Sequence, residues 1–337
     1  MSDSRITIPH TLMKRLLFSL VAASAVLLAS PLAQGEGPVD ETRITLRHEF
    51  LRIINRDRAE NGLRPLGLDP ESSIIADNYC REQIRNRTSG HFTLDGLPPY
   101  MRYSFAGGND GVGENAAAWS ANYRFSDRAL YEMIVRSEQA MMRETAPLDG
   151  HRRTILDPNA THVGIGLAWE GGEFRITQEF VRRYVNWKWP LPRVAALTER
   201  ATAAGTPVNG FHVEAISVYH EPLPRPMTVA EANLRNSYNL PGNRRDYLPQ
   251  LRRYYERRSD GSLYEMKEEY VDGRRGDFTV ATDKSFAFDV PFSAGPGVYT
   301  VVVWVRRDGA PPIPASNISI RVDPPRADTY YAGGGTK

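Results

Sequence analysis

The sequence predicts an α/β (α+β) protein in two folded parts, a mixed unit over residues 43–189 and an antiparallel β-sandwich over residues 210–323. Three observations support this fold class. Within residues 44–59, 70–88 and 126–141, apolar side chains recur at the three- and four-residue spacing of helices. Between residues 162 and 181 they alternate with smaller or polar residues, as in a hairpin. Beyond residue 210, short strand-like runs are separated by turn residues.

The composition is that of an ordinary globular protein. At 337 residues the chain is longer than one hydrophobic core usually organises, so two domains are expected. Hydrophobic residues make up 41% and charged residues 24%, which excludes wholesale disorder and a many-pass membrane protein. The formal net charge is +2 and the arginines are spread along the chain, so no nucleic-acid surface is expected.

The first 35 residues are predicted to be a signal peptide. Basic residues precede a short apolar run at 16–29, which is well below the ~20 residues of a membrane-spanning helix. Ala33 and Gly35 are small enough for a cleavage site, and translation can begin at Met13. We therefore expect a secreted protein, extracellular or periplasmic, with no membrane span after cleavage. An uncleaved anchor is the alternative.

The single cysteine, Cys80, cannot form an internal disulfide, so an exported chain of this size must be held by its core. Cys80 shares an apolar helical stripe with Ala76 and Ile84. This position favours a buried small hydrophobe over a catalytic thiol.

Two helices and a long loop are expected at the start of the mixed unit. The first helix covers residues 44–59, where apolar residues recur at helical spacing. Asp69 offers a capping side chain directly before Pro70 at a first helical position, which opens a second helix that ends before Ser89. Residues 93–113 are rich in Gly and Pro and are expected to form a long ordered loop.

A third helix is expected to begin at Ser126 or Asp127, either of which can cap it. The residues on its inward stripe are Leu130, Met133, Ile134, Ser137 and Met141. At about 100° per residue, Glu144 projects onto the same stripe, whereas Glu132 falls on the opposite face and Glu138 near the edge. A carboxylate is therefore expected where apolar residues belong.

A hairpin is expected to complete the mixed unit. Residues 162–169 alternate apolar side chains with smaller or polar ones, and Gly171-Gly172 supplies a turn before a second run at 174–181. His162, at the start of the hairpin, is expected to pack beside it rather than to bind a ligand.

The second part is expected to be a β-sandwich of roughly immunoglobulin-like size, reached through a linker at residues 190–209. Its clearest strand-like runs are 211–218, 278–281, 286–290, 298–305 and 318–322. Residues 324–337 lack periodicity and are expected to form a flexible tail. This domain is also the expected contact for an extracellular or cell-surface partner.

Four polar residues lie at the ends of expected elements in the mixed unit, namely His91, Glu114, Glu144 and His151. Two imidazoles and two carboxylates can bind a divalent metal ion, or can serve as a general acid and base around a bound hydroxyl or water. No compact H-E-x-x-H pattern is present. Residue types alone therefore leave ordinary solvated or capping side chains as the alternative.

The motifs around these residues occur in an order that is typical of one family. They are GHF at 90–92, GENA at 113–116, GHRRTIL at 150–156, THVGIG at 161–166 and TQEF at 177–180. Together they resemble bacterial CAP domains, of the SCP/TAPS superfamily that unites cysteine-rich secretory proteins, antigen 5 and pathogenesis-related 1 proteins. The likeness covers roughly residues 46–185.

The resemblance implies a three-layer α-β-α sandwich with a large cleft lined by a His/Glu/Glu/His tetrad. By motif, His91 matches the first histidine, Glu114 the glutamate of the G-E-N motif and His151 the histidine of the H-R-x-x-I-L motif. Gln178 matches a residue that usually lines the cleft. Asn115 is placed in the cleft with it, and a tight turn around Glu114 is the alternative role for Asn115.

The second glutamate of the tetrad is assigned by an offset. The family usually places it just after a tryptophan on the third helix, and Met141 stands at that position here. Glu144 keeps the expected offset. Glu173 and Glu179 are the fallback candidates.

Three functions follow from this reading, and a binding module is preferred to an enzyme. The cleft is expected to take Zn²⁺ or another divalent cation, a small lipid, sterol or peptide, or both. The first alternative is a metal-assisted hydrolase, a peptidase or cell-wall enzyme, in which Glu114 or Glu144 activates water. The second alternative is a structural or adhesive protein with a relict cleft. No nucleophile stands beside a base, so covalent catalysis is least expected.

Overall fold

The structure is a computed structural model that describes residues 41–189, 191–251 and 253–324. The predicted signal peptide and almost all of the predicted tail lie outside the described residues. From Glu41 onward the contacts form one compact unit. Within the described residues, no helix has both the length and the apolar content needed to cross a membrane.

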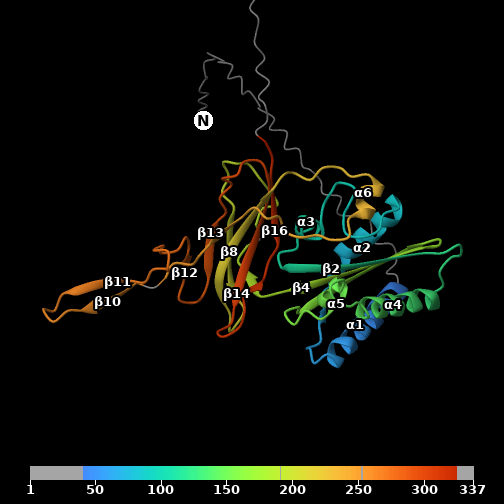
Figure 1. The fold of residues 1–337 in the computed structure, drawn as a ribbon, viewed down its shortest axis with the longest axis horizontal. Helices are drawn as coiled ribbons and strands as arrows, with labels where there is room; N and C mark the ends of the chain where they lie inside the picture. Colours follow the sequence, from blue (N-terminus) through green and yellow to red (C-terminus); the bar gives the residue numbers. More distant parts are fainter. Residues whose placement is uncertain (1–40, 190, 252, 325–337) are drawn as a thin grey trace, which may run out of the picture. The chain divides into compact units, whose positions relative to one another are not determined.

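The mixed unit is built from helices on both faces of a four-stranded sheet. The strands, in the order β1-β3-β4-β2, are β1 (Gly67–Leu68), β3 (His162–Glu170), β4 (Glu173–Arg182) and β2 (Gly111–Ser120). The helices are α1 (Glu41–Glu60), α2 (Pro70–Asn86), α3 (Pro99–Phe105), α4 (Asp127–Met142) and α5 (Gly150–Ile155). In Figure 1, α2 lies on one side of β2 and β4, and α1 and α4 lie on the other. The predicted α-β-α layers are therefore present.

The alternation of side chains along β3 explains how the layers pack. Val163, Ile165 and Leu167 belong to the core shared with α1 and α4. Gly164 and Gly166 face α2, where an added Cβ would lie 2.4 Å and 2.3 Å from atoms of that helix. The glycines of the T-H-V-G-I-G motif thus let α2 pack directly on the sheet.

The predicted helices and hairpin are confirmed, with two differences. Asp69 caps α2 by accepting the backbone N–H groups of Glu71 and Ser72, as its position before Pro70 indicates. The region expected to be a loop at 93–113 instead contains the helix α3, and β2 begins inside it. The G-E-N motif therefore lies on an edge strand paired with β4, rather than in a turn.

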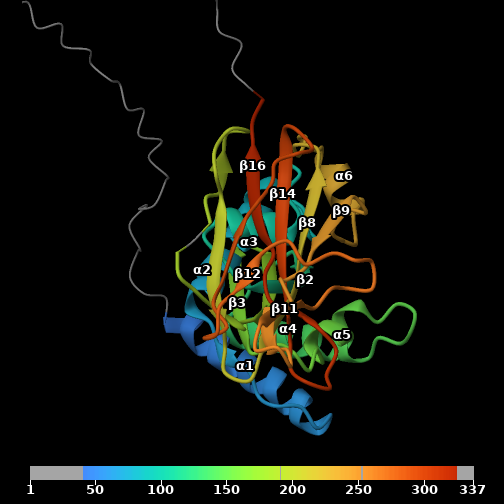
Figure 2. The ribbon, with the colours of Figure 1, turned by 90° about the vertical axis from the view of Figure 1, so that its left-hand side faces the viewer.

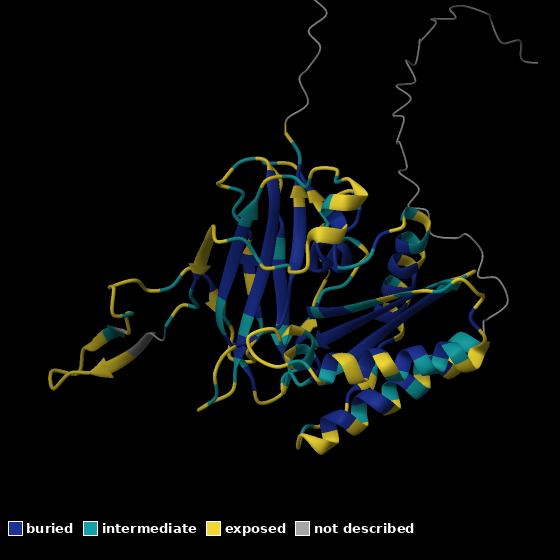
Figure 3. Ribbon diagram, turned by 45° about the vertical axis from the view of Figure 1, so that its right-hand side comes forward, coloured by how far each residue is buried: buried dark blue, intermediate teal, exposed yellow. Residues whose placement is uncertain are grey.

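The second part consists of two sheets around one core. One sheet has the order β12-β13-β7-β5, with β5 (Val185–Trp187), β7 (Thr202–Pro207), β12 (Thr279–Val280) and β13 (Phe286–Asp289). The other has the order β6-β16-β14-β8-β9, with β6 (Val194–Ala195), β8 (His212–Glu221), β9 (Arg244–Tyr247), β14 (Gly297–Arg306) and β16 (Ile318–Val322). A short strand β15 (Ile313–Pro314) pairs with β14. Figure 2 shows β16, β14 and β8 side by side, and Figure 3 shows their buried faces.

The predicted linker at 190–209 is wrong, because it contains two strands of this sandwich. The run Thr202–Pro207 lacks large apolar side chains, yet it forms β7 between β13 and β5. Gly205 makes this possible, since a Cβ there would lie 2.8 Å from Val185. The sandwich therefore begins at Val185, inside the range assigned to the first domain.

Two excursions leave the sandwich. The hairpin β10 (Arg253–Arg257) and β11 (Leu263–Lys267) forms a separate two-stranded sheet, and Figure 3 shows its exposed residues. The connection between β8 and β9, residues 222–243, contains the helix α6 (Val229–Leu234). We call this connection the strap.

Candidate functional site

His91 and Glu114 form the buried half of the site. His91 follows α2 and is 7% exposed, and its Nδ1 lies 2.8 Å from Oε1 of Glu114 on β2. Arg102 of α3 forms an ion pair with Glu114 and donates to Glu179 at 3.2 Å. Arg102 also donates to the backbone carbonyl of His91 at 3.1 Å. One guanidinium thus holds both members of the pair.

Burial and the charge of Arg102 favour the neutral form of His91. Burial, and next the positive charge of Arg102, lower the pKa of His91 to about 4. Arg102 keeps Glu114 an acceptor, so the Nδ1–H group of a neutral His91 donates to the carboxylate. The Nε2 atom of His91 then carries the free lone pair.

Glu144 and His151 form the more exposed half. The Nδ1 atom of His151 lies 2.5 Å from Glu144 Oε1, and Glu144 Oε2 accepts the backbone N–H of His151 at 2.9 Å. The side chains of His151 and Glu144 are 35% and 23% exposed, against 8% and 0% for His91 and Glu114. This half therefore faces solvent, whereas the other is enclosed.

Glu144 lies at the site but not on the predicted helical face. The helix α4 ends at Met142, so Glu144 lies in the turn that follows it. Its carboxylate is placed by accepting the backbone N–H of His151 in the first turn of α5. A helix start, rather than a helix face, positions this glutamate.

The two histidine–glutamate pairs lie next to each other, with their imidazole rings as neighbours. The ring centroids of His91 and His151 are 6.4 Å apart, and the rings are tilted by 33°. Within residues 41–189, 191–251 and 253–324, no three or more His, Cys, Asp or Glu side chains are placed together to hold a metal ion. The arrangement offers two imidazoles, each engaged by its own carboxylate.

Asn115 and Gln178 lie beneath the site and are buried. The amide of Asn115 donates to the backbone carbonyl of His151 and to Gln178 Oε1, both at 3.1 Å. The amide of Gln178 donates to Glu138 at 2.7 Å. These side chains support His151 from behind.

Glu138 is the member of this network that the sequence reading missed. It lies at the edge of the α4 stripe but is 0% exposed, and burial raises its pKa to about 8. The sequence signal was only its position one residue after Ser137 on that stripe. Which edge residues become buried depends on what packs against the helix.

The other candidates lie elsewhere. Glu179 is buried beneath His91, and burial raises its pKa to about 7, with Arg102 opposing the shift. Glu173 lies at the far end of β4 and pairs with Arg175. His162 packs against Gly67, as expected of a packed side chain. The buried thiol of Cys80 has its pKa raised by burial to about 12, which suits a packed residue.

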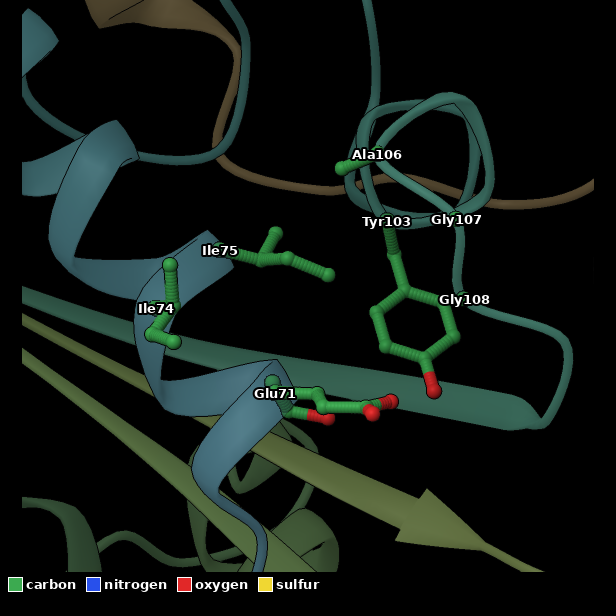
Figure 4. Close-up of a pocket in the computed structure, with 8 residues that line it drawn as sticks. Glu71, Ile74, Ile75, Tyr103, Ala106, Gly107 and Gly108 are labelled. Carbon is green, nitrogen blue, oxygen red and sulfur yellow. The ribbon is translucent and has the colours of Figure 1, made fainter. Parts of the chain in front are cut away.

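A separate hollow of about 240 Å³ lies between α2 and the end of α3. Figure 4 shows Glu71, Ile74 and Tyr103 around it. Its lining contains none of the four tetrad residues and no other histidine. It is therefore distinct from the histidine site.

The motif order and the site geometry agree with a comparison with known families. Residues 51–180 match the model of the cysteine-rich secretory protein family, CAP. We therefore call residues 51–180 the CAP domain of this chain. The sandwich and the strap follow the matched residues.

One curated relative shares a quarter of its aligned residues with this chain. The protein YkwD of Bacillus subtilis strain 168 is 25% identical over 134 residues, which cover 40% of this chain and 46% of that protein. The chain thus spans about half the length of the curated relative it matches.

Two solved structures are also similar in part. One is an extracellular protein containing an SCP domain from Bacillus anthracis, with 18% identity and a TM-score of 0.34, covering 44% of this chain and 45% of that one. The other is a cysteine-rich secretory protein from Staphylococcus aureus, with 19% identity and a TM-score of 0.30, covering 44% and 42%.

Proposed function

We propose that the CAP domain binds a divalent metal ion through His91 and His151, with Zn²⁺ as the best candidate. The observation that supports this is the Nδ1–carboxylate contact made by each ring. A histidine that ligates a metal almost always donates its other N–H to a carboxylate, a backbone carbonyl or water, which fixes the ring and makes the ligating nitrogen more basic. Both His91 and His151 have this contact on Nδ1, which leaves Nε2 of each ring for the metal ion.

The carboxylates act as orienting partners in this proposal. Glu114 is 0% exposed at its side chain and is held by His91 and Arg102. Glu144 accepts both the ring and the backbone N–H of His151. Four direct protein ligands would require these contacts to break. Two direct histidine ligands leave them intact.

Two imidazoles leave coordination positions for water or for an oxygen atom of a ligand. We propose that a small lipid, sterol or peptide binds from the side of His151, where the site is exposed. A metal ion there would polarise the bound oxygen. Binding is favoured over hydrolysis because both carboxylates are engaged by the histidines rather than free to take a proton from water.

The proposed cellular location of this function is based on the sequence alone. We propose that the apolar run at 16–29 directs export, so that the site works outside the cytoplasm. A cell-surface partner for the sandwich stays a prediction.

Metal binding is tested by titrating the metal-free protein with ZnCl₂ in a calorimeter. We expect about one equivalent to bind, and His91→Ala and His151→Ala each to weaken binding by at least about tenfold. The matched control is His48→Ala, an exposed histidine of α1, which should bind like the wild type. Failure of the wild type to bind Zn²⁺ at micromolar concentrations would contradict the proposal, as would binding that persists when His91→Ala and His151→Ala are combined in one variant.

A further inference from the structure

The strap of the second part lies along the loop that carries His91. The backbone N–H of Met227 donates to the carbonyl of Leu94 at 2.7 Å, and Asn233 accepts the backbone N–H of Ser89 at 2.7 Å. The guanidinium of Arg235 lies 4.8 Å from the ring centre of Phe92. The strap therefore contacts residues that precede His91 in the sequence and residues that follow it.

Tyr238 of the strap reaches both members of the buried pair. Its hydroxyl accepts the backbone N–H of Glu114 and donates to the Glu114 carbonyl at 2.9 Å. Its ring meets the ring of His91 edge to face, with 4.8 Å between centroids and 63° between planes. The Tyr238 side chain therefore contacts both His91, the proposed metal ligand, and Glu114, the residue that orients His91.

The position of β2 explains why a hydroxyl is suited to this place. β2 is the outer strand of its sheet, so alternate backbone N–H and C=O groups face away from β4 and need other partners. A tyrosine hydroxyl can donate and accept at once, and it satisfies both outward groups of Glu114. Without it, the backbone that carries the Glu114 carboxylate loses its outer support.

We propose that Tyr238 is a positioning residue of the CAP site, so that the site is composite and is completed by the second part of the chain. The hydroxyl fixes Glu114, Glu114 and the Tyr238 ring fix His91, and the strap covers His91 from solvent. Ligands then reach the site from the His151 side. The effect on metal affinity rests on the proposed function, whereas the shielding of His91 does not.

The test compares Tyr238→Phe and Tyr238→Ala with a control, Tyr255→Ala, in the full chain. Tyr255 is a tyrosine of the same part that is 65% exposed on β10. Because supporting partners of metal ligands usually contribute 10–100-fold in affinity, we expect Tyr238→Ala to raise the Zn²⁺ dissociation constant at least about tenfold. Tyr238→Phe keeps the ring and should raise it by less. Tyr255→Ala should leave it unchanged.

The second measurement needs no metal. Diethyl pyrocarbonate modifies accessible histidine nitrogens, and mass spectrometry of peptides resolves each site. We expect His151 to react in every variant, and His91 to be protected in the wild type, Tyr238→Phe and Tyr255→Ala but to react in Tyr238→Ala. Hydrogen exchange should be faster at residues 112–116 in Tyr238→Phe than in the wild type, because the Glu114 N–H loses its acceptor.

The outcomes separate this proposal from metal binding itself. If the wild type binds no Zn²⁺, the proposed function fails, and His91 reactivity together with hydrogen exchange still decides the role of Tyr238. A folded Tyr238→Ala protein in which His91 stays protected overturns the composite site. Zn²⁺ affinity equal to that of the wild type in both variants also overturns it. If Tyr238→Ala does not fold, unchanged exchange at residues 112–116 in Tyr238→Phe overturns it.

Discussion

Glu138 shows how one buried side chain makes stability depend on pH. Burial raises its pKa from an ordinary value of 4.5 to about 8. The folded state therefore holds this proton more tightly than the unfolded state does. The contribution of Glu138 to the free energy of unfolding is fully present below about pH 4.5. As the pH rises towards 8 the advantage is lost, by up to about 5 kcal/mol for this group.

Glu138→Gln is expected to remove this dependence. Glutamine cannot ionise and still offers an oxygen to the Gln178 amide. Denaturant unfolding should show the variant gaining stability relative to the wild type between pH 5 and pH 8, by a few kcal/mol. Glu132→Gln, on the exposed side of α4, is the control and should show no such trend. A constant difference across this range would argue against a buried, proton-binding Glu138.

Single residues also show the limits of motif reading. His91, Glu114 and His151 were located by the motifs around them, and the structure brings them together. Glu144 is predicted to lie on the face of a helix, but that helix ends at Met142. Tyr238 carried no signal, because a tyrosine in a segment without periodicity gives no indication of what it touches.

At the level of elements, the packing of α2 on β3 depends on glycine. A Cβ at Gly166 would lie 2.3 Å from the backbone carbonyl carbon of Ala76, far below van der Waals contact. The obstacle is backbone, so it cannot be relieved by rotating a side chain. The helix or the strand would have to move.

Gly166→Ala is therefore expected to destabilise the protein by about 1–3 kcal/mol or more, as overpacking in a close-packed interior does. The measurement is the midpoint and slope of denaturant unfolding. Gly242→Ala is a suitable control, since nothing lies within 4 Å of a Cβ there. Equal stability of the two variants would show that α2 is not held against the sheet as described.

Elements with a strong pattern were predicted correctly, and those without one were not. The α1, α2 and α4 helices and the β3–β4 hairpin have clear periodicity. β2 and β7 are rich in alanine and glycine; β2 begins inside the predicted loop at 93–113, and β7 lies inside the predicted linker at 190–209. Pairing with β4 and with β13 makes them strands, and that pairing is not encoded in their own periodicity.

At the scale of the whole molecule, the second part covers the outer edge of β2. Gly111 N–H donates to the Ala315 carbonyl at 2.9 Å, and Val112 N–H donates to Asn317 Oδ1 at 2.7 Å. Tyr238 continues this series at Glu114. The edge of the CAP sheet is thus completed by residues far along the chain, and we expect the described parts to unfold together.

Asn317→Ala tests this coupling. It leaves the Val112 N–H without its acceptor in a buried place, which should cost about 1–3 kcal/mol. Scanning calorimetry should show one lowered transition rather than two. Asn78→Ala, at an exposed position of α2, is the control and should stay close to the wild type. Separate transitions in the wild type would contradict a shared edge.

The sequence by itself determined the fold class, the order of the patterned elements and three residues of the candidate site, because periodicity and motifs are local properties. The tertiary structure decided the rest. It placed Glu138 inside, made strands of β2 and β7, and brought Tyr238 to His91. Those outcomes depend on which surfaces meet across more than a hundred residues of chain, as Tyr238 and Glu114 do, and local sequence does not specify such meetings.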